Sequence, residues 1–132
     1  MGRGPGVLLI RFIRNTRRCV MAEFFIDGAS LLRIYTAEKD QINGIPLYEW
    51  IVQRAVTEGL SGATVLRGIG GYCSSNPVLA PEFRGFQINQ PVIVEIVDTE
   101  KSLEEFIRKI DPQIKRGLMT LSPVKTRYYG KN

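Results

Sequence analysis

The residues best suited to chemistry lie at the end of a predicted strand, where an arginine precedes a glycine-rich segment and a tyrosine. The sequence there is Arg67-Gly68-Ile69-Gly70-Gly71-Tyr72. Such glycines can expose backbone N–H groups to an anionic ligand, and a planar guanidinium suits phosphate. The structural alternative is a turn or bulge that needs positive φ, with Arg67 neutralising a carboxylate such as that of Glu95. Tyr72 fits either stacking on a ligand base or packing at the base of a loop.

A long segment without helical or strand periodicity follows, from residue 73 to residue 90. Connections of this length are usually functional or disordered. The segment also contains apolar residues that a purely solvated linker would not need, namely Val78, Leu79, Phe83 and Phe86. We expect these residues to dock on a protein partner, or alternatively to fold back on a neighbouring subunit. Cys73 is either a redox-sensitive thiol of this loop or incidental to it.

Three further charged residues are candidates outside the glycine-rich segment. Lys115 and Arg116 lie at a predicted turn between a helix and a strand, where they either meet a phosphate or remain solvated. Glu95 lies within a very apolar strand, where burial would perturb its pKa. A structural ion pair of Glu95 with Arg33 or Arg67 is the favoured interpretation.

The composition argues against several kinds of catalytic and metal sites. The chain has no histidine and only two cysteines, Cys19 and Cys73. Zinc sites of the usual Cys/His type and Ser-His-Asp arrangements therefore have no ligand or base available. No pair of carboxylates has a spacing that indicates acid–base catalysis. We therefore expect a protein that is not an enzyme and holds no metal, in a reducing, cytoplasmic compartment.

The positive charge is concentrated at the N-terminus. The chain carries 18 Lys and Arg against 13 Asp and Glu, for a net charge of +5, and residues 1–20 contain five arginines and no acid. Residues 21–132 are balanced, which argues against a nucleic-acid partner. We interpret residues 1–20 as a basic extension, either disordered or upstream of a natural start at Met21. A targeting or membrane-surface segment is the alternative. Residues 21–132 are predicted to form one domain.

The apolar pattern predicts four main strands and two helices. A first strand at residues 30–36 places Leu32 and Ile34 on one face and Arg33 and Tyr35 on the other. A loop at 37–45 precedes a helix that begins near Pro46, carries an apolar stripe from Leu47 to Val56 and stops at Gly59. Strands follow at 63–69 and 91–97, then a helix with a stripe from Leu103 to Ile110 after the cap candidates Asp98 and Thr99. Two short strands, 117–121 and 124–129, flank Ser122-Pro123.

This order is β-α-β-β-α-β, the split βαβ pattern of a ferredoxin-like α+β fold. It predicts an antiparallel four-stranded sheet with two helices on one face. The opposite face carries Arg33, Tyr35 and Glu95 among apolar residues, so it is not a freely solvated surface. We therefore expect further copies of the same chain to pack against this face of the sheet.

Several separated motifs occur together in an order that resembles the domain-of-unknown-function 190 family, which is grouped with the PII-like signalling proteins. They are LLRIYT, GIPLYEWIV, GLSGATVLRGIGGY, PVIVEIVD and GLMTL, and the resemblance spans residues 31–129. It implies a PII-like ferredoxin-like fold, a homotrimer with its sheets packed around the axis, and ligand clefts between subunits. Residues 1–20 are not covered.

The resemblance also implies where an effector would bind. In PII proteins, nucleotide lies near the base of the long loop and near a second loop between the second helix and the last strand. The matching residues are Arg67, Gly68, Gly70, Gly71 and Tyr72 in the first region and Lys115 and Arg116 in the second. The segment 111–117 lacks a glycine-rich phosphate cradle of the PII type, and Cys73 replaces the glycine usual in relatives.

The function expected from these features is that of a trimeric regulator. It would bind a small anionic effector, with an adenine nucleotide as one candidate, between subunits. The loop would then act on a protein partner, with a membrane transporter or channel as a candidate. The alternative is a structural trimer like the copper-tolerance CutA proteins, related to a metal or free of ligand.

Overall fold

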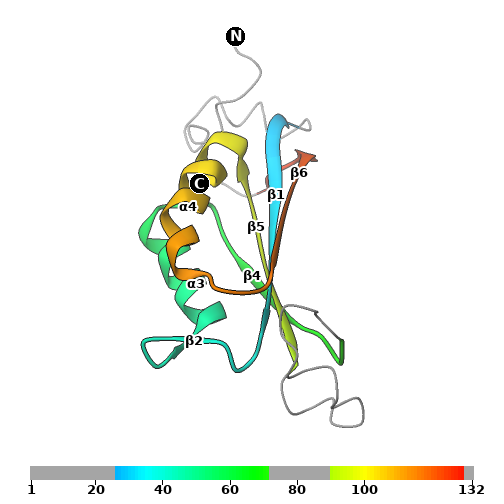
Figure 1. Cartoon of the computed structure of the whole chain (residues 1–132). Helices are drawn as coiled ribbons and strands as arrows, with labels where there is room; N and C mark the ends of the chain where they lie inside the picture. The colour runs from blue at the N-terminus through cyan, green and yellow to red at the C-terminus, as the bar shows by residue number, and fades with distance from the viewer. Residues whose placement is uncertain (1–25, 72–89, 130–132) are drawn as a thin grey trace.

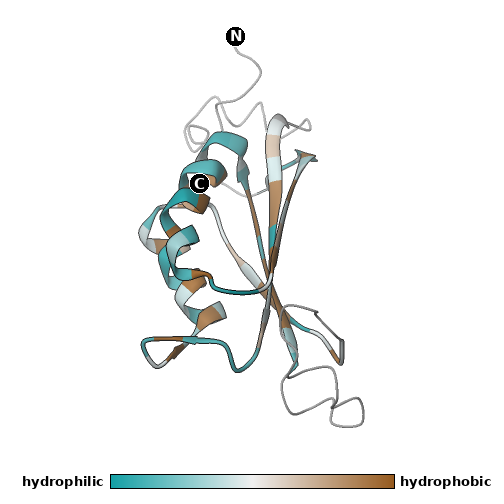
Figure 2. Cartoon of the chain, in the orientation of Figure 1, coloured by the Kyte–Doolittle hydropathy of each residue, from teal (hydrophilic) through white to brown (hydrophobic). Residues whose placement is uncertain are grey.

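Apolar side chains from a sheet and from two helices meet in one layer that forms the core. The structure is a computed structural model of the 132-residue chain and describes residues 26–71 and 90–129. Leu32 of the sheet and Ile51 and Phe106 of the helices are almost inaccessible to solvent in this layer. Figure 2 shows the apolar residues along the central strands and on both helices.

The main sheet contains four antiparallel strands in the order β4-β5-β1-β6. Strand β1 spans Ile26–Ala37, β4 Thr64–Arg67, β5 Pro91–Thr99 and β6 Leu118–Thr126. Helices α3 (Leu47–Thr57) and α4 (Glu100–Ile110) both lie on one face of this sheet (Figure 1). The chain therefore has the predicted ferredoxin-like α+β fold, with β5 and β1 as its central strands.

Helix α3 begins and ends where the sequence predicts. Pro46 precedes its first residue, and Gly59 adopts a φ of +78° just after its end, which a glycine tolerates at little cost. Leu47, Ile51 and Ala55 are buried at a spacing of four residues. The predicted stripe was too wide, because Val56 is 73% exposed.

Helix α4 begins at a side-chain cap. The Thr99 hydroxyl accepts a hydrogen bond from the Ser102 amide at 3.1 Å, which satisfies one of the free N–H groups of the first turn. Leu103, Phe106 and Ile110 are buried against the sheet. A short 3-10 turn, Asp111–Gln113, follows the last helical residue and leads toward β6.

Two predictions about the strands were wrong. The expected loop at 37–45 contains a hairpin of β2 (Gln41–Ile42) and β3 (Ile45–Pro46), whose Asn43-Gly44 turn has φ values of +52° and +81°. Such a turn matches the twist of paired strands. The two short strands expected around Ser122-Pro123 form the single strand β6, because an edge strand tolerates a proline that cannot donate to a neighbour.

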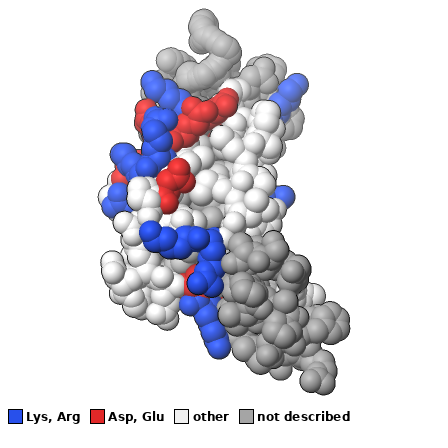
Figure 3. Space-filling model, in the orientation of Figure 1, with Lys and Arg blue, Asp and Glu red and all other residues white. Residues whose placement is uncertain are grey.

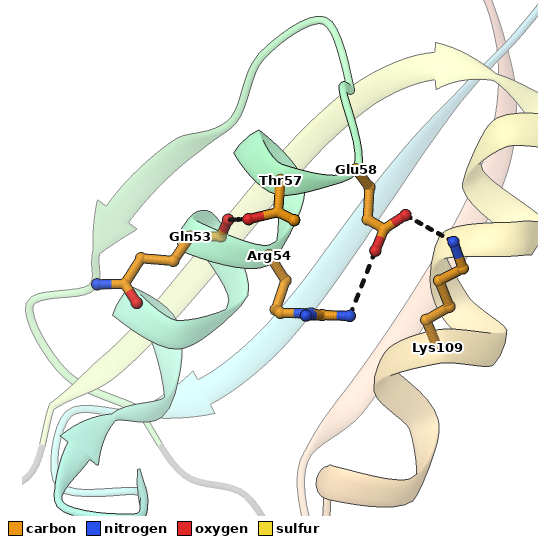
Figure 4. A network of polar contacts seen from close by, with 5 residues as sticks. All are labelled: Gln53, Arg54, Thr57, Glu58 and Lys109. Carbon is orange, nitrogen blue, oxygen red and sulfur yellow. Dashed lines mark hydrogen bonds and ion pairs between the residues drawn. The ribbon is translucent and has the colours of Figure 1, made fainter.

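An ion-pair network joins the C-terminal halves of the two helices (Figure 4). Glu58 accepts from Arg54 at 3.3 Å along α3 and from Lys109 of α4 at 2.6 Å. Lys109, assisted by Arg54, lowers the pKa of the Glu58 carboxyl below its ordinary value.

Within the described ranges, neither helix has the length and apolar character needed to cross a bilayer.

Candidate functional site

An ion pair occupies the last residue of β4, directly before the glycine-rich segment. Nη1 of Arg67 lies 2.6 Å from Oε2 of Glu38, the residue that follows β1. The Glu38 carboxylate, with a smaller contribution from Tyr48 of α3, raises the pKa of Arg67. In return, the guanidinium lowers the pKa of Glu38. The sequence suggested Glu95 as the carboxylate partner of Arg67, whereas the structure pairs Arg67 with Glu38 of the same chain.

The strand register explains why these residues meet. Arg67 pairs with Val92 of β5, and Val92 pairs with Thr36 of β1, so Glu38 lies just beyond the same end of the sheet. Val92 is buried on the same face of β5 as Val94 and Ile96 of the core cluster, which places Arg67 on the helix-covered side of β4. Glu38 and Arg67 thus come together across β5 from strands that are not neighbours.

Backbone hydrogen bonds hold the residues around this ion pair. The Glu38 amide donates to the Gln90 carbonyl at 2.8 Å, and the Gly68 amide donates to the Pro91 carbonyl at 2.8 Å. On β1, the Thr36 hydroxyl donates to the Val92 carbonyl at 3.1 Å. The N–H group of Gly68 is therefore already satisfied and is not open to an anion in this arrangement.

The glycines after Arg67 are required for close packing, not for a left-handed turn. None of Gly68, Gly70 and Gly71 has positive φ, so the positive φ that the structural alternative required was wrong, although the chain bends at residues 69–70. A Cβ atom on Gly68 would lie 2.8 Å from Cγ of Pro91, and one on Gly71 would lie 3.2 Å from it. Both distances are shorter than ordinary carbon contacts, so a larger residue at position 68 requires Pro91 to move, and one at position 71 requires a smaller shift. An anion-binding role for Gly70 and Gly71 remains a prediction.

The second basic region lies at the same end of the sheet but at its opposite edge. Lys115 and Arg116 follow the 3-10 turn and precede β6, whose Leu118 pairs with Tyr35. Nζ of Lys115 donates to the Pro112 carbonyl at 3.2 Å. Because β4 and β6 are the two outer strands, Arg67 and Leu118 are separated by three strand spacings, about 14 Å in all. The two predicted regions therefore adjoin different outer strands of the sheet.

The face of the sheet opposite the helices carries an ion pair between rows of apolar side chains. Nε of Arg33 lies 2.6 Å from Oε2 of Glu95, which confirms the structural ion pair predicted for Glu95. This pair raises the pKa of Arg33. The next row of this face runs across all four strands and is apolar throughout, comprising Leu66, Ile93, Tyr35 and Leu118. Leu118 is 56% exposed and Leu66 44% exposed in the single chain.

Charge is distributed differently on the helical side. In the view of Figure 3, acidic and basic side chains gather over the helices, whereas much of the strand side is uncharged. Trp50 of α3 is partly buried against the core, and the Arg54 guanidinium lies 5.9 Å from its ring centroid. Among residues 26–71 and 90–129, no group of three or more His, Cys, Asp or Glu side chains is placed to hold a metal ion.

Several predicted residues lie outside the described residues. These are Tyr72 of the ligand region and the partner-contacting residues Cys73, Val78, Leu79, Phe83 and Phe86. Conversely, the sequence analysis missed Glu38 and Tyr48 as neighbours of Arg67. No local pattern marks them, because their proximity depends on the pairing of β1 with β5 and of β5 with β4.

Comparisons with known proteins agree on family and fold. The family model described as DUF190, Uncharacterized ACR, matches residues 29–126. A UPF0166 protein of Aquifex aeolicus is 37% identical over 98 residues, which cover 74% of this chain and 92% of that protein. A UPF0166 protein of Methanocaldococcus jannaschii is 37% identical over 95 residues, covering 71% and 87% respectively.

The structural comparison extends the likeness to PII proteins. The solved structure of CPII from Thiomonas intermedia K12, bound to ADP and bicarbonate, matches with a TM-score of 0.59. The match covers 80% of this chain and 93% of that chain at 11% sequence identity. At this identity the likeness is one of fold.

Proposed function

Because this chain belongs to the DUF190 family and has a PII-like fold, we propose that it is a non-enzymatic homotrimeric regulator that binds a small anion between subunits. The main support for this proposal is the position of the chain's two basic regions. Arg67 and the pair Lys115-Arg116 lie at one end of the sheet but on opposite edges. A neighbouring copy can bring the Arg67 edge of one chain to the Lys115 edge of the next.

The open face of the sheet supports self-association. Four apolar side chains form a row across it beside the Arg33–Glu95 ion pair. Contiguous exposed apolar surface of this kind is typical of a protein interface, and closed symmetric assemblies of one chain are the commonest soluble oligomers. We therefore propose that Arg33, Tyr35 and Glu95 lie in the subunit interface.

The chemistry of the anion follows from the groups available. A guanidinium forms paired hydrogen bonds with carboxylate or phosphate oxygens, and a lysine adds a point charge. CPII, which shares the fold, was solved with ADP and bicarbonate. These two compounds are therefore the first probes, with ADP representing the adenine nucleotides.

Native mass spectrometry of the full chain tests both parts of this proposal. We expect a trimer whose mass increases in steps of one ADP, and weaker ADP binding in Arg67→Ala and in Lys115→Ala. Lys101→Ala, which removes the same charge from an exposed position of α4, is the matched control and should bind normally. A trimer that binds neither ADP nor bicarbonate would favour a structural trimer of the CutA type.

We further propose that residues 72–89, which join β4 to β5, act on a protein partner such as a membrane transporter or channel. The apolar residues Val78, Leu79, Phe83 and Phe86 support this proposal, since they offer anchors for a partner surface. Replacing Phe83 and Phe86 by serine should abolish co-sedimentation with membranes of the source cells and leave the trimer and ADP binding intact. Unchanged co-sedimentation would contradict this role for the segment.

A further inference from the structure

Glu38 contacts two segments that are far apart in the sequence. Its backbone amide binds the Gln90 carbonyl at 2.8 Å, and its carboxylate binds Arg67 at 2.6 Å. One residue therefore connects the end of β4 with the start of β5, at the place where the Gly68 amide also binds the Pro91 carbonyl. Opening the ion pair would remove the side-chain link that Glu38 adds to the backbone pairing of β4 with β5.

The ion pair is accessible and uses only part of what Arg67 offers. The Arg67 side chain is 51% exposed and that of Glu38 is 33% exposed, so solutes reach both groups. The contact joins one guanidinium nitrogen to one carboxylate oxygen. An anion with two or three oxygens can form paired hydrogen bonds with the same guanidinium, which are stronger and better oriented than a single contact. Exposed ion pairs are weak enough to exchange partners.

We propose that Glu38 is an internal competitor for the anion at Arg67, so that an incoming carboxylate, bicarbonate or phosphate must displace the Glu38 carboxylate before it binds. This inference rests on the anion-binding function proposed above and adds how that binding is restrained. By competing for Arg67, Glu38 raises the effector concentration that is needed to fill the site. Displacement also releases the link from β1 to the end of β4.

The competition is tested by comparing the full wild-type chain with Glu38→Gln, which keeps the size of the side chain and removes its charge. The probes are ADP, sodium bicarbonate and inorganic phosphate, titrated by isothermal calorimetry at constant ionic strength. We expect Glu38→Gln to bind at least one of them about two- to five-fold more tightly, the range that loss of an exposed ion-pair competitor allows. Arg67→Ala should bind the same probe more weakly than wild type.

The matched control is Glu58→Gln. It removes one negative charge and a 2.6 Å ion pair with Lys109, but at the opposite end of α3 from Tyr48, about 15 Å from Tyr48 along the helix axis. It should leave the probe affinity unchanged. A gain equal to that of Glu38→Gln would mean that net charge, and not competition at Arg67, causes the effect, and would overturn the inference.

Amide hydrogen exchange tests the link without any ligand. We expect the amides of Gly68 and residue 38 to exchange about two- to five-fold faster in Glu38→Gln than in wild type, because one link between the strand ends is lost. Unchanged exchange at both amides would refute the link whether or not a probe binds.

The outcomes separate this inference from the proposed function. If a probe binds both proteins equally and Arg67→Ala abolishes binding, the proposed anion site stands and the role of Glu38 is wrong. If Glu38→Gln binds a probe that wild type does not, both are supported. If none of the three probes binds either protein, both are refuted for these anions.

Discussion

At the scale of single residues, a buried carboxylate holds the turn after α3 against the end of β5. Asp98 is only 6% exposed, and its Oδ2 atom accepts hydrogen bonds from the Ser61 amide and the Ser61 hydroxyl, both at 2.9 Å. Its Oδ1 atom accepts from the Thr99 amide at 2.7 Å. The buried carboxylate thus accepts three hydrogen bonds, and hydrogen bonds to a carboxylate are stronger than those between neutral groups.

We expect Asp98→Ala to lower the free energy of unfolding by about 1.5–3 kcal/mol, because hydrogen bonds to a buried carboxylate acceptor are lost. Urea unfolding followed by circular dichroism at one protein concentration measures this change. Asp111→Ala, at an exposed position after α4, should change the free energy by about 0.5 kcal/mol or less. Equal losses in the two variants would show that Asp98 has no special role.

Gly117, which lies between the second basic region and β6, occupies a position that only glycine fits without strain. Gly117 has a φ of +117°, and a Cβ atom added there would lie 2.4 Å from the Tyr35 carbonyl oxygen. We expect Gly117→Ala to destabilise the fold by about 1–3 kcal/mol through backbone strain and this clash. Gly62→Ala is the control, since no atom lies within 4 Å of its added Cβ and its φ is not positive. Thermal unfolding of both variants compares the two positions, and equal melting temperatures would contradict the strain.

At the scale of elements, most of the fold could be predicted because local patterns specify it. The alternation of Leu32 and Ile34 with Arg33 and Tyr35 gave the faces of β1 correctly, and Gly59 marked the end of α3. The continuity of β6 through Pro123 could not be predicted, because it depends on the strand lying at the edge of the sheet. Arg33 was one of the two partners predicted for Glu95, whereas Glu38 was not predicted as the partner of Arg67, because these two residues meet only across β5.

The contact between α3 and α4 should depend on pH through Glu58. Lys109 and Arg54 lower its folded pKa below the ordinary value of 4.5, so the ion pairs stabilise the fold above that pH. This contribution is lost as the pH falls through the lowered folded pKa, where the carboxylate becomes protonated. We expect the difference in urea midpoint between wild type and Glu58→Gln to be constant from pH 7 to about pH 5 and to decrease at lower pH. A difference that stays constant down to pH 2 would show that the charge of Glu58 contributes nothing.

At the scale of the whole molecule, the two faces of the sheet have different roles. The helices bury the central strands on one face, whereas the described part of the chain leaves the other face with exposed Leu66 and Leu118 on the outer strands and partly exposed Ile93 and Tyr35 between them. The Arg33–Glu95 pair at its centre is satisfied within one chain, so covering the face would not leave either charge without a partner. Both features favour burial of this face against further copies.

The last prediction tests which surface joins the copies. Leu118 on the open face and Val56 on the outside of α3 are both more than half exposed in the single chain, at 56% and 73%. A glutamate at position 118 would bring an unpaired charge into the proposed interface, where desolvation is costly, whereas one at position 56 would remain in water. We therefore expect Leu118→Glu to convert the trimer to monomers and Val56→Glu to leave it intact, as measured by multi-angle light scattering at micromolar concentration. Circular dichroism of both variants checks that each is folded. A wild-type monomer, or dissociation by Val56→Glu alone, would show that the open face of the sheet does not join the subunits.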